Sequence, residues 1–157
     1  QSSKDSLDSY CALQSKAFLW GCQLGWNSTW LLRDTHREHL AFTIRLCKER
    51  LANLDFLLEG ELLGELPTIS GQPMVDVDWT RERVGAFKVP AIMGTIWRNG
   101  DGTRCRAFLV NVSGSEQTYS PPIESKYSFS TVVLSPYSVL SLDVIERNKK
   151  ENHKEYR

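Results

Sequence analysis

Residues 88–112, KVPAIMGTIWRNGDGTRCRAFLVNV, decide which fold this chain adopts. Two apolar segments, at 88–98 and 104–112, flank the turn sequence NGDG at 99–102. Asn-Gly and Asp-Gly favour tight hairpin turns because these residues tolerate positive φ. The stretch therefore predicts a β-hairpin. Pro90 cannot donate to a β-ladder, so we expect the first strand to start just after it or to lie at a sheet edge there.

Short strands are also predicted before and after this hairpin. Residues 74–79 (MVDVDW) alternate apolar and acidic side chains, as half-buried strands do. Turn residues and prolines separate three more strand-like runs, at 117–120, 127–134 and 138–145. About six short strands in succession favour an antiparallel sandwich or a barrel-like meander for residues 67–146.

The part of the chain before Pro67 is rich in Leu and has helical periodicity. Between positions 35 and 59, apolar residues recur at steps of four and three, which places them on one helical face. This apolar stripe consists of Leu40, Ile44, Cys47, Leu51, Leu54 and Leu58. Thr35 and Glu38 have the spacing of a capping box, and Gly60 is expected to end the helix in the left-handed conformation.

The apolar stripe needs a partner. We expect Ile44, Leu51 and Leu54 to be buried, either against the β-domain or against a second copy of the chain in a homodimer. A coiled coil is less favoured because the flanking positions lack the charges that select its partner. Further apolar residues widen this surface beyond one stripe: Ala41, Phe42, Leu46, Phe56 and Leu57.

The segment 16–26 (KAFLWGCQLGW) is apolar and aromatic but contains Gly21 and Gly25, which disfavour a helix. A buried strand followed by a loop fits it as well. Residues 5–15 are weakly helical.

The chain therefore divides into a mainly helical segment at 1–66, an antiparallel β-domain at 67–146 and a charged tail at 147–157. The predicted fold class is α+β, with the N-terminal helical segment packed on an antiparallel β-sandwich.

Composition excludes several classes of protein. The 157 residues, 41% hydrophobic and 24% charged, fit one ordinary globular domain. Because 19 basic residues balance 19 acidic ones, a strongly basic nucleic-acid-binding protein is disfavoured. No apolar run approaches the roughly 18 residues that cross a bilayer, so no membrane partner is expected. The first ten residues lack the apolar core of a secretory signal, and the chain does not begin with Met. We expect a mature form or a piece of a longer protein, and the sequence indicates no compartment.

The four cysteines show no CxxC spacing, which disfavours zinc ribbons and thioredoxin-like sites. We expect Cys22, Cys47 and Cys105 to be small buried side chains, while a disulfide of undetermined pairing stays open.

Three groups of polar residues resemble catalytic or metal sites only in part. They are Asp76 with Asp78, Glu59 with Glu61 and Glu65, and His36 with His39. The aspartates would share one strand face, but EF-hand spacing and a third ligand are absent. The glutamates surround glycines at the helix–sheet junction, and the histidines lack metalloprotease spacing. We therefore expect solvated surfaces, with no catalytic residue, no metal and no cofactor.

The aromatic residues Trp20, Trp26 and Trp30 lie within eleven positions, with Gln23 and Asn27 between them. Flat rings beside amides hold sugars, because a ring packs on the apolar face of a pyranose while amides bind its hydroxyls. The alternative is that the three rings are core anchors.

Two short patterns, at Asn27 and Asn111, match the N-glycosylation acceptor. The pattern is common, and without a signal sequence it predicts little.

Four segments in order carry a family resemblance: 17–27 (AFLWGCQLGWN), 36–63, 107–119 (AFLVNVSGSEQTY) and 134–144 (LSPYSVLSLDV). Their order resembles the C-terminal end of bacterial glycoside-hydrolase-like proteins, in particular a large uncharacterised family with a central (β/α)8 barrel. In that family an antiparallel β-sandwich follows the last barrel strand and helix. Its [FL]-V-N-hydroxyl strand is similar to residues 108–113 here, and its closing P-x-S-V-x-x-L strand is similar to residues 136–142.

The resemblance implies a parent protein that handles carbohydrate. A barrel needs about 250 residues, so its acid and base carboxylates would lie on earlier strands, and no catalytic residue is carried over. By the same resemblance, Gln23 and Trp26 would follow the last barrel strand, on the side where barrel loops build active sites. They are the candidate substrate-binding residues.

We therefore expect the non-catalytic C-terminal region of a glycoside-hydrolase-like enzyme, whose partners are the barrel of the parent and a carbohydrate. The alternative is a self-standing carbohydrate-binding or protein-interaction module. A stand-alone enzyme is a third and less favoured hypothesis, because no coherent set of acid, base and orienting groups is present.

Overall fold

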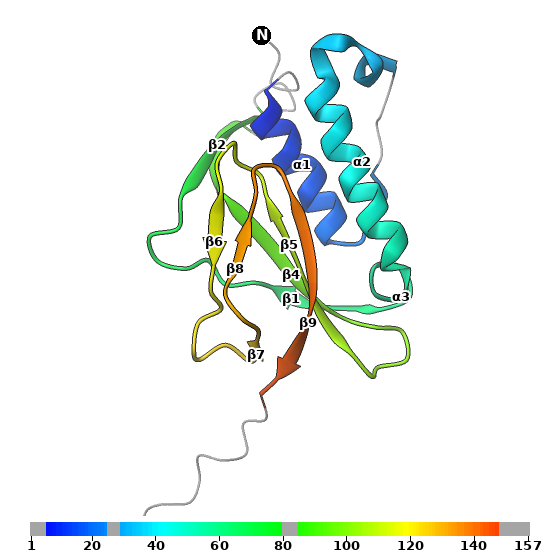
Figure 1. Ribbon diagram of the computed structural model, residues 1–157, viewed down its shortest axis with the longest axis vertical. Helices are drawn as coiled ribbons and strands as arrows, with labels where there is room; N and C mark the ends of the chain where they lie inside the picture. Colours follow the sequence, from blue (N-terminus) through cyan, green and yellow to red (C-terminus); the bar gives the residue numbers. More distant parts are fainter. Residues whose placement is uncertain (1–5, 25–28, 80–84, 148–157) are drawn as a thin grey trace, which may run out of the picture.

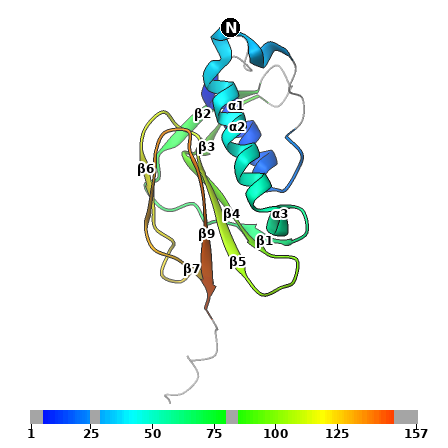
Figure 2. The ribbon, with the colours of Figure 1, turned by 45° about the vertical axis from the view of Figure 1, so that its right-hand side comes forward.

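The computed structural model describes residues 6–24, 29–79 and 85–147, and its fold is α+β (Figure 1). An N-terminal helical region packs on antiparallel strands. The helices are α1 (Leu7–Leu19), α2 (Arg37–Ala52) and the short α3 (Leu54–Leu57), with 3-10 turns at Thr29–Leu32 and Asp34–His36. Helices α1 and α2 lie side by side and run in the same direction (Figures 1 and 2).

The main sheet has five strands in the order β1-β4-β5-β9-β7. These strands are β1 (Glu61–Glu65), β4 (Ile92–Arg98), β5 (Cys105–Asn111), β9 (Val139–Glu146) and β7 (Tyr127–Ser128). Two strand pairs accompany it: β2 (Met74–Trp79) with β3 (Gly85–Pro90), and β6 (Gln117–Tyr119) with β8 (Val132–Leu134). Every pairing is antiparallel, as the sequence predicted.

Strand β5 lies at the centre because both of its faces are buried. Phe108 and Val110 belong to the core between the sheet and the helices. Ala107 and Leu109 belong to a second core, beneath the β6–β8 pair. The continuous apolar run at 107–110 is typical of a strand that is covered on both sides. The sheet is therefore the middle layer of the molecule (Figure 2).

The predicted hairpin is confirmed. Strands β4 and β5 pair from Arg98 with Cys105 to Ile92 with Asn111, around the turn at 99–102. Of the two turn glycines, Gly102 has the positive φ, 77°. Strand β2 has the predicted bounds, and in the described part of 88–145 no helix occurs.

The helix predicted between positions 35 and 59 differs in two ways. It is interrupted at Asn53, between α2 and α3. It also buries another face: His39, Phe42, Thr43 and Leu46 of α2 are buried. The expected burial against the β-domain is wrong for Ile44 and Leu51, which are 44% and 69% exposed, while Leu54 is half-buried. Leu58 of the same stripe is 64% exposed. The alternative, burial against a second copy of the chain, stays a prediction. The other apolar residues named above, Phe42 and Leu46 with Phe56 and Leu57, carry the contact with the sheet.

The possibility of a buried strand within 16–26 is also wrong. Residues 16–19 form the last turn of α1, which then ends in a turn at Trp20 and Gly21. Gly21 has φ of +71°, and a side chain there would meet Trp97 and the carbonyl oxygen of Leu57. The glycine thus ends the helix where the chain passes closely over the sheet, rather than preventing the helix.

Gly60 does not adopt the left-handed conformation expected of it. An added Cβ would instead meet the carbonyl oxygens of Phe56 and Arg98. Glycine is needed here for a close backbone approach at the start of β1. This strand was not predicted, and residues 61–65 pair with β4 across a bulge between Leu62 and Gly64. The bulge and the absence of β-branched residues explain why residues 61–65 carry no strand signal.

Candidate functional site

A cleft of about 300 Å³ opens where the C-terminal end of α1 meets β1, β4 and the β2–β3 pair. Aromatic side chains contribute much of its lining, from Trp20, Trp79, Phe87 and Tyr119. Lys16 and Glu65 supply charged groups at its edge. This is at the lower end of the size range of small-molecule sites, and it combines apolar walls with a few polar groups, as those sites do.

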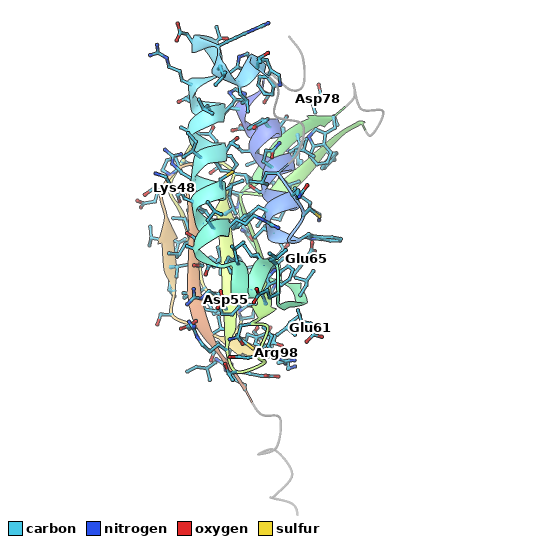
Figure 3. All side chains as sticks on the ribbon, turned by 90° about the vertical axis from the view of Figure 1, so that its right-hand side faces the viewer. Lys48, Asp55, Glu61, Glu65, Asp78 and Arg98 are labelled. Atoms are coloured by element: carbon cyan, nitrogen blue, oxygen red, sulfur yellow. The ribbon has the colours of Figure 1, made fainter. Side chains whose placement is uncertain are left out.

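Three side chains that line the cleft, Lys16, Trp20 and Glu65, are joined by polar contacts. Lys16 donates from Nζ to Oε1 of Glu65 at 3.1 Å, and Trp20 donates from Nε1 to the same oxygen at 3.1 Å. The ammonium group also lies 5.1 Å from the centroid of the Trp20 ring, within cation–π range. Figure 3 shows Glu65 beside the end of α1. Trp20 is nevertheless 49% exposed, so the contacts orient its ring without burying it.

The hydrogen bond from Lys16 holds the pKa of Glu65 below its ordinary value, and the hydrogen bond from Trp20 acts in the same direction. Glu65 is therefore a carboxylate near neutral pH and accepts hydrogen bonds. A general acid needs the opposite shift, a raised pKa. Glu65 is also the single carboxylate that lines the cleft among the described residues.

The aromatic walls are fixed by their own contacts. The rings of Trp79 and Phe87 face each other across β2 and β3, edge to face, with centroids 4.8 Å apart. Tyr119 donates to the carbonyl oxygen of Pro67 at 2.9 Å. Because the three rings come from rigid strands and have fixed neighbours, the cleft is formed before any ligand binds.

The other carboxylates singled out in the sequence lie on exposed surfaces outside the cleft. Glu61 lies beside Arg98, with an ion pair of 3.2 Å (Figure 3). Asp76 and Asp78 are exposed on the same face of β2, as expected, and Asp76 binds Lys88 of the neighbouring strand at 3.0 Å. Glu59 is exposed. Glu61 and Asp76 thus take part in surface ion pairs.

Of the two predicted substrate-binding residues, Gln23 lies in the described part of the chain. Gln23 is exposed in the loop after α1, and Trp26 lies outside the described residues. Because α1 is a helix, Gln23 does not follow a strand, contrary to the implied barrel position. The cleft was not predicted from the sequence, because Lys16 and Trp20 at the end of α1 are 45 or more positions from Glu65 and from the other aromatic residues that line it.

The histidines and Trp30 form an aromatic cluster in the helical layer. Trp30 packs edge to face on Tyr10 and on His36, with centroids 5.6 Å and 4.8 Å apart. His39 is buried beside both Tyr10 and Trp30. His39 is thus a core residue, not a solvated one at a helix start, and Trp30 is an anchor.

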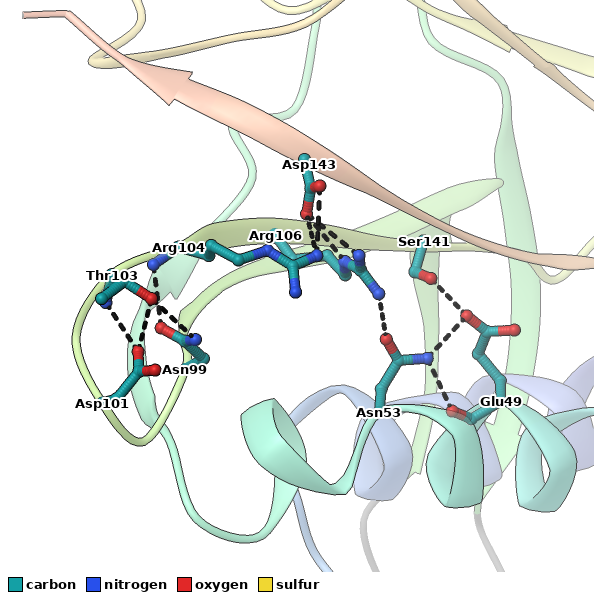
Figure 4. Close-up of polar contacts among 9 residues, drawn as sticks. All are labelled: Glu49, Asn53, Asn99, Asp101, Thr103, Arg104, Arg106, Ser141 and Asp143. Carbon is teal, nitrogen blue, oxygen red and sulfur yellow. Dashed lines mark hydrogen bonds and ion pairs between the residues drawn. The ribbon is translucent and has the colours of Figure 1, made fainter.

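A polar network fixes the interruption between α2 and α3 to the sheet (Figure 4). Asn53, which is 2% exposed, donates to the carbonyl oxygen and the carboxylate of Glu49, at 2.8 and 3.1 Å. Arg106 of β5 donates to Oδ1 of Asn53 and pairs with Asp143 of β9 at 3.0 Å. Burial would raise the pKa of Asp143, but hydrogen bonds from Arg106 and Arg104 lower it overall. Every partner is saturated within the fold, so the network is a structural clamp.

The Asn111 motif is structural as well. Asn111 is fully buried, and its Nδ2 donates to three carbonyl oxygens, those of Ser115, Leu134 and Ser135. Its Oδ1 accepts from the backbone N–H and the hydroxyl of Ser113. In the folded chain this amide is inaccessible as a glycan acceptor.

All four cysteines are free. Cys11 is fully buried, and burial raises the pKa of its thiol. Cys47 and Cys105 are half-buried, whereas Cys22 is exposed, so its expected burial is wrong.

Within the described ranges no cluster of three or more His, Cys, Asp and Glu side chains is suited to a metal ion. Nor is any helix in these ranges both long and apolar enough to span a bilayer.

Comparisons with protein families, with curated proteins and with solved structures find no match to this chain.

Proposed function

We propose that this chain is the non-catalytic C-terminal region of a carbohydrate-active, glycoside-hydrolase-like protein, and that it docks on the rest of that protein through the apolar stripe. The observation that carries the proposal is the exposure of Ile44, Leu51 and Leu58 along one side of α2 and α3. The fold does not need this stripe, because the opposite apolar residues already bury the helix. Large apolar residues gathered on one exposed face mark interaction sites.

A non-catalytic role is supported by the carboxylates. Glycoside hydrolysis uses two carboxyl groups that flank one bond, one of them with a raised pKa. The cleft offers Glu65 alone among the described residues, and the pKa of Glu65 is lowered. The remaining support is the resemblance in the order of sequence motifs.

A second candidate function is a self-standing carbohydrate-binding or protein-interaction module. The specific observation in its favour is the exposed ring of Trp20 in a preformed cleft. The two candidates differ in what they require of the stripe. A docking region exposes the stripe only when it is separated from its partner, whereas a module keeps it exposed in its working state.

The test compares the chain alone with the longer protein that includes the preceding region, each with and without Leu51→Lys. The docking role predicts that the chain alone self-associates through the stripe and that Leu51→Lys makes it monomeric in sedimentation experiments. In the longer protein the amides of α2 exchange more slowly than in the chain alone, and the same change lowers the melting temperature. Asp55→Lys is the matched control, since Asp55 is exposed on α3 outside the stripe.

Docking would be excluded, and the module favoured, by two results together. The chain alone would be monomeric, and the amides of α2 would exchange no more slowly in the longer protein than in the chain alone. Aryl-glycoside assays test the non-catalytic role separately. Turnover by the chain alone that Glu65→Gln, Glu61→Gln or Asp78→Asn abolishes would show that it is an enzyme.

A further inference from the structure

We propose that the cleft at the end of α1 binds a neutral saccharide, with a sugar ring stacked on Trp20 and its hydroxyl groups bound by Lys16 and Glu65. The choice of a carbohydrate rests on the proposed function, while the site itself rests on the geometry of the cleft. The cleft and the apolar stripe are formed by different residues, so each can fail without the other.

The first argument is the exposed Trp20 ring. Trp20 is 49% exposed, whereas an indole ring is on average highly buried. Here two polar contacts, from Lys16 and to Glu65, hold the ring at the mouth of the cleft. A flat ring held in this way offers the C–H face of a pyranose a preorganised surface.

The second argument is the charge of the polar corner. The ammonium group of Lys16 and the carboxylate of Glu65 lie 3.1 Å apart and neutralise each other. An anion or a cation would have to displace one partner of this pair, whereas a hydroxyl group matches both. A hydroxyl can donate to the carboxylate and accept from the ammonium group at the same time. The corner therefore favours neutral, hydroxyl-rich ligands over charged ones.

The third argument is the shape and lining of the cleft. Trp79, Phe87 and Met93 add apolar surface to the lining. The hydroxyl group of Thr95 is directed elsewhere, to the carbonyl oxygen of Leu19 at 2.9 Å. Lys16 and Glu65 are the charged side chains of the lining, and its apolar side chains are suited to the apolar faces of sugar rings. The volume of about 300 Å³ fits a short saccharide.

The experiment uses the whole chain and isotope-edited NMR titrations, with calorimetry for any ligand that shifts resonances. The neutral probes are trisaccharides of α-1,4- and β-1,4-linked glucose and of β-1,4-linked xylose. The charged probes are trisaccharides of galacturonic acid and of glucosamine. The variants are Trp20→Ala and Glu65→Gln, and Leu32→Ala is the control because Leu32 is exposed outside the cleft.

We expect at least one neutral probe to shift the indole resonance of Trp20 with a Kd near or below about 1 mM. Trp20→Ala should weaken that binding about tenfold or more, Glu65→Gln severalfold, and Leu32→Ala not at all. Circular dichroism verifies that the variants fold.

Three results would overturn the proposal. The first is the absence of shifts with all neutral probes at about 20 mM, well above a 1 mM Kd. The second is binding that Trp20→Ala leaves unchanged, and the third is tighter binding of a charged trisaccharide than of the neutral ones. Loss of docking in the Leu51→Lys experiment, with sugar binding intact, would leave this inference standing.

Discussion

Nδ2 of Asn111, at the end of β5, donates a hydrogen bond of 3.1 Å to the carbonyl oxygen of Leu134, at the end of β8. This contact joins the central sheet to the strand pair that covers its second face. Ser113, two residues after Asn111, completes the arrangement by donating its N–H and hydroxyl to the same side chain. The Asn-x-Ser sequence therefore links the central sheet to the β6–β8 pair through hydrogen bonds.

Asn111→Ala should lower the free energy of unfolding by about 2–4 kcal/mol, because it leaves several buried carbonyl and N–H groups without a partner. Urea unfolding followed by circular dichroism measures the change. Thr118→Ala, on the exposed side of β6, is the control and should stay within about 0.5 kcal/mol of the parent. Equal stability of both variants would mean that Asn111 does not hold the layers together.

The two apolar faces of α2 should differ sharply in their contribution to stability. Phe42→Ala removes a fully buried ring and should cost about 3–5 kcal/mol. Leu51→Ala removes an exposed side chain and should cost less than about 0.5 kcal/mol in the monomer. Chemical denaturation at low protein concentration measures the free energy of unfolding of each variant without self-association. A larger loss of stability in Leu51→Ala than in Phe42→Ala would contradict the observed orientation of the helix.

Alkaline pH should destabilise the fold through Tyr119. Burial raises the pKa of Tyr119 to about 12, while an unfolded tyrosine titrates near 10. The stabilisation is complete below about pH 10 and is lost as the pH rises toward about 12, because the unfolded chain releases the proton first. Stability measured across this range should decline less steeply in Tyr119→Phe.

Tyr119→Phe also removes the hydrogen bond to the carbonyl oxygen of Pro67 and should cost about 1 kcal/mol at neutral pH. Tyrosinate absorbance supplies the control, because the variant should lose the amplitude of one tyrosine from the step at about pH 12. A loss of amplitude from the ordinary tyrosine step at about pH 10 would instead show that Tyr119 ionises early.

Gly60→Ala should cost about 1–3 kcal/mol or more, because the new methyl group meets two backbone carbonyl oxygens that cannot rotate away. Gly102→Ala serves for comparison, since its surroundings are open and only its positive φ of 77° opposes a side chain, at about 1–2 kcal/mol. Thermal unfolding compares the two. A Gly60 variant as stable as the parent would contradict the close approach of α3 to β4.

The β-hairpin and β2 could be predicted from the sequence because their signals are local. The turn at 99–102 depends on the backbone freedom of a few adjacent residues, and residues 74–79 alternate with a period of two. Strand β1 carried no such signal, because its pairing with β4 comes from partners 30 or more positions away.

Local patterns in the sequence were enough to predict the α+β class, the positions of most strands and an apolar helix with more than one apolar face. Which of those faces is buried depends on the sheet, because Phe42 and the apolar stripe are both able to pack until the sheet covers one of them. The cleft depends on tertiary packing as well, since it brings Lys16 and Trp20 at the end of α1 to Glu65 of β1. Periodicity acts over a few turns of one element, whereas a site needs the distances between elements, and those depend on how the whole core packs.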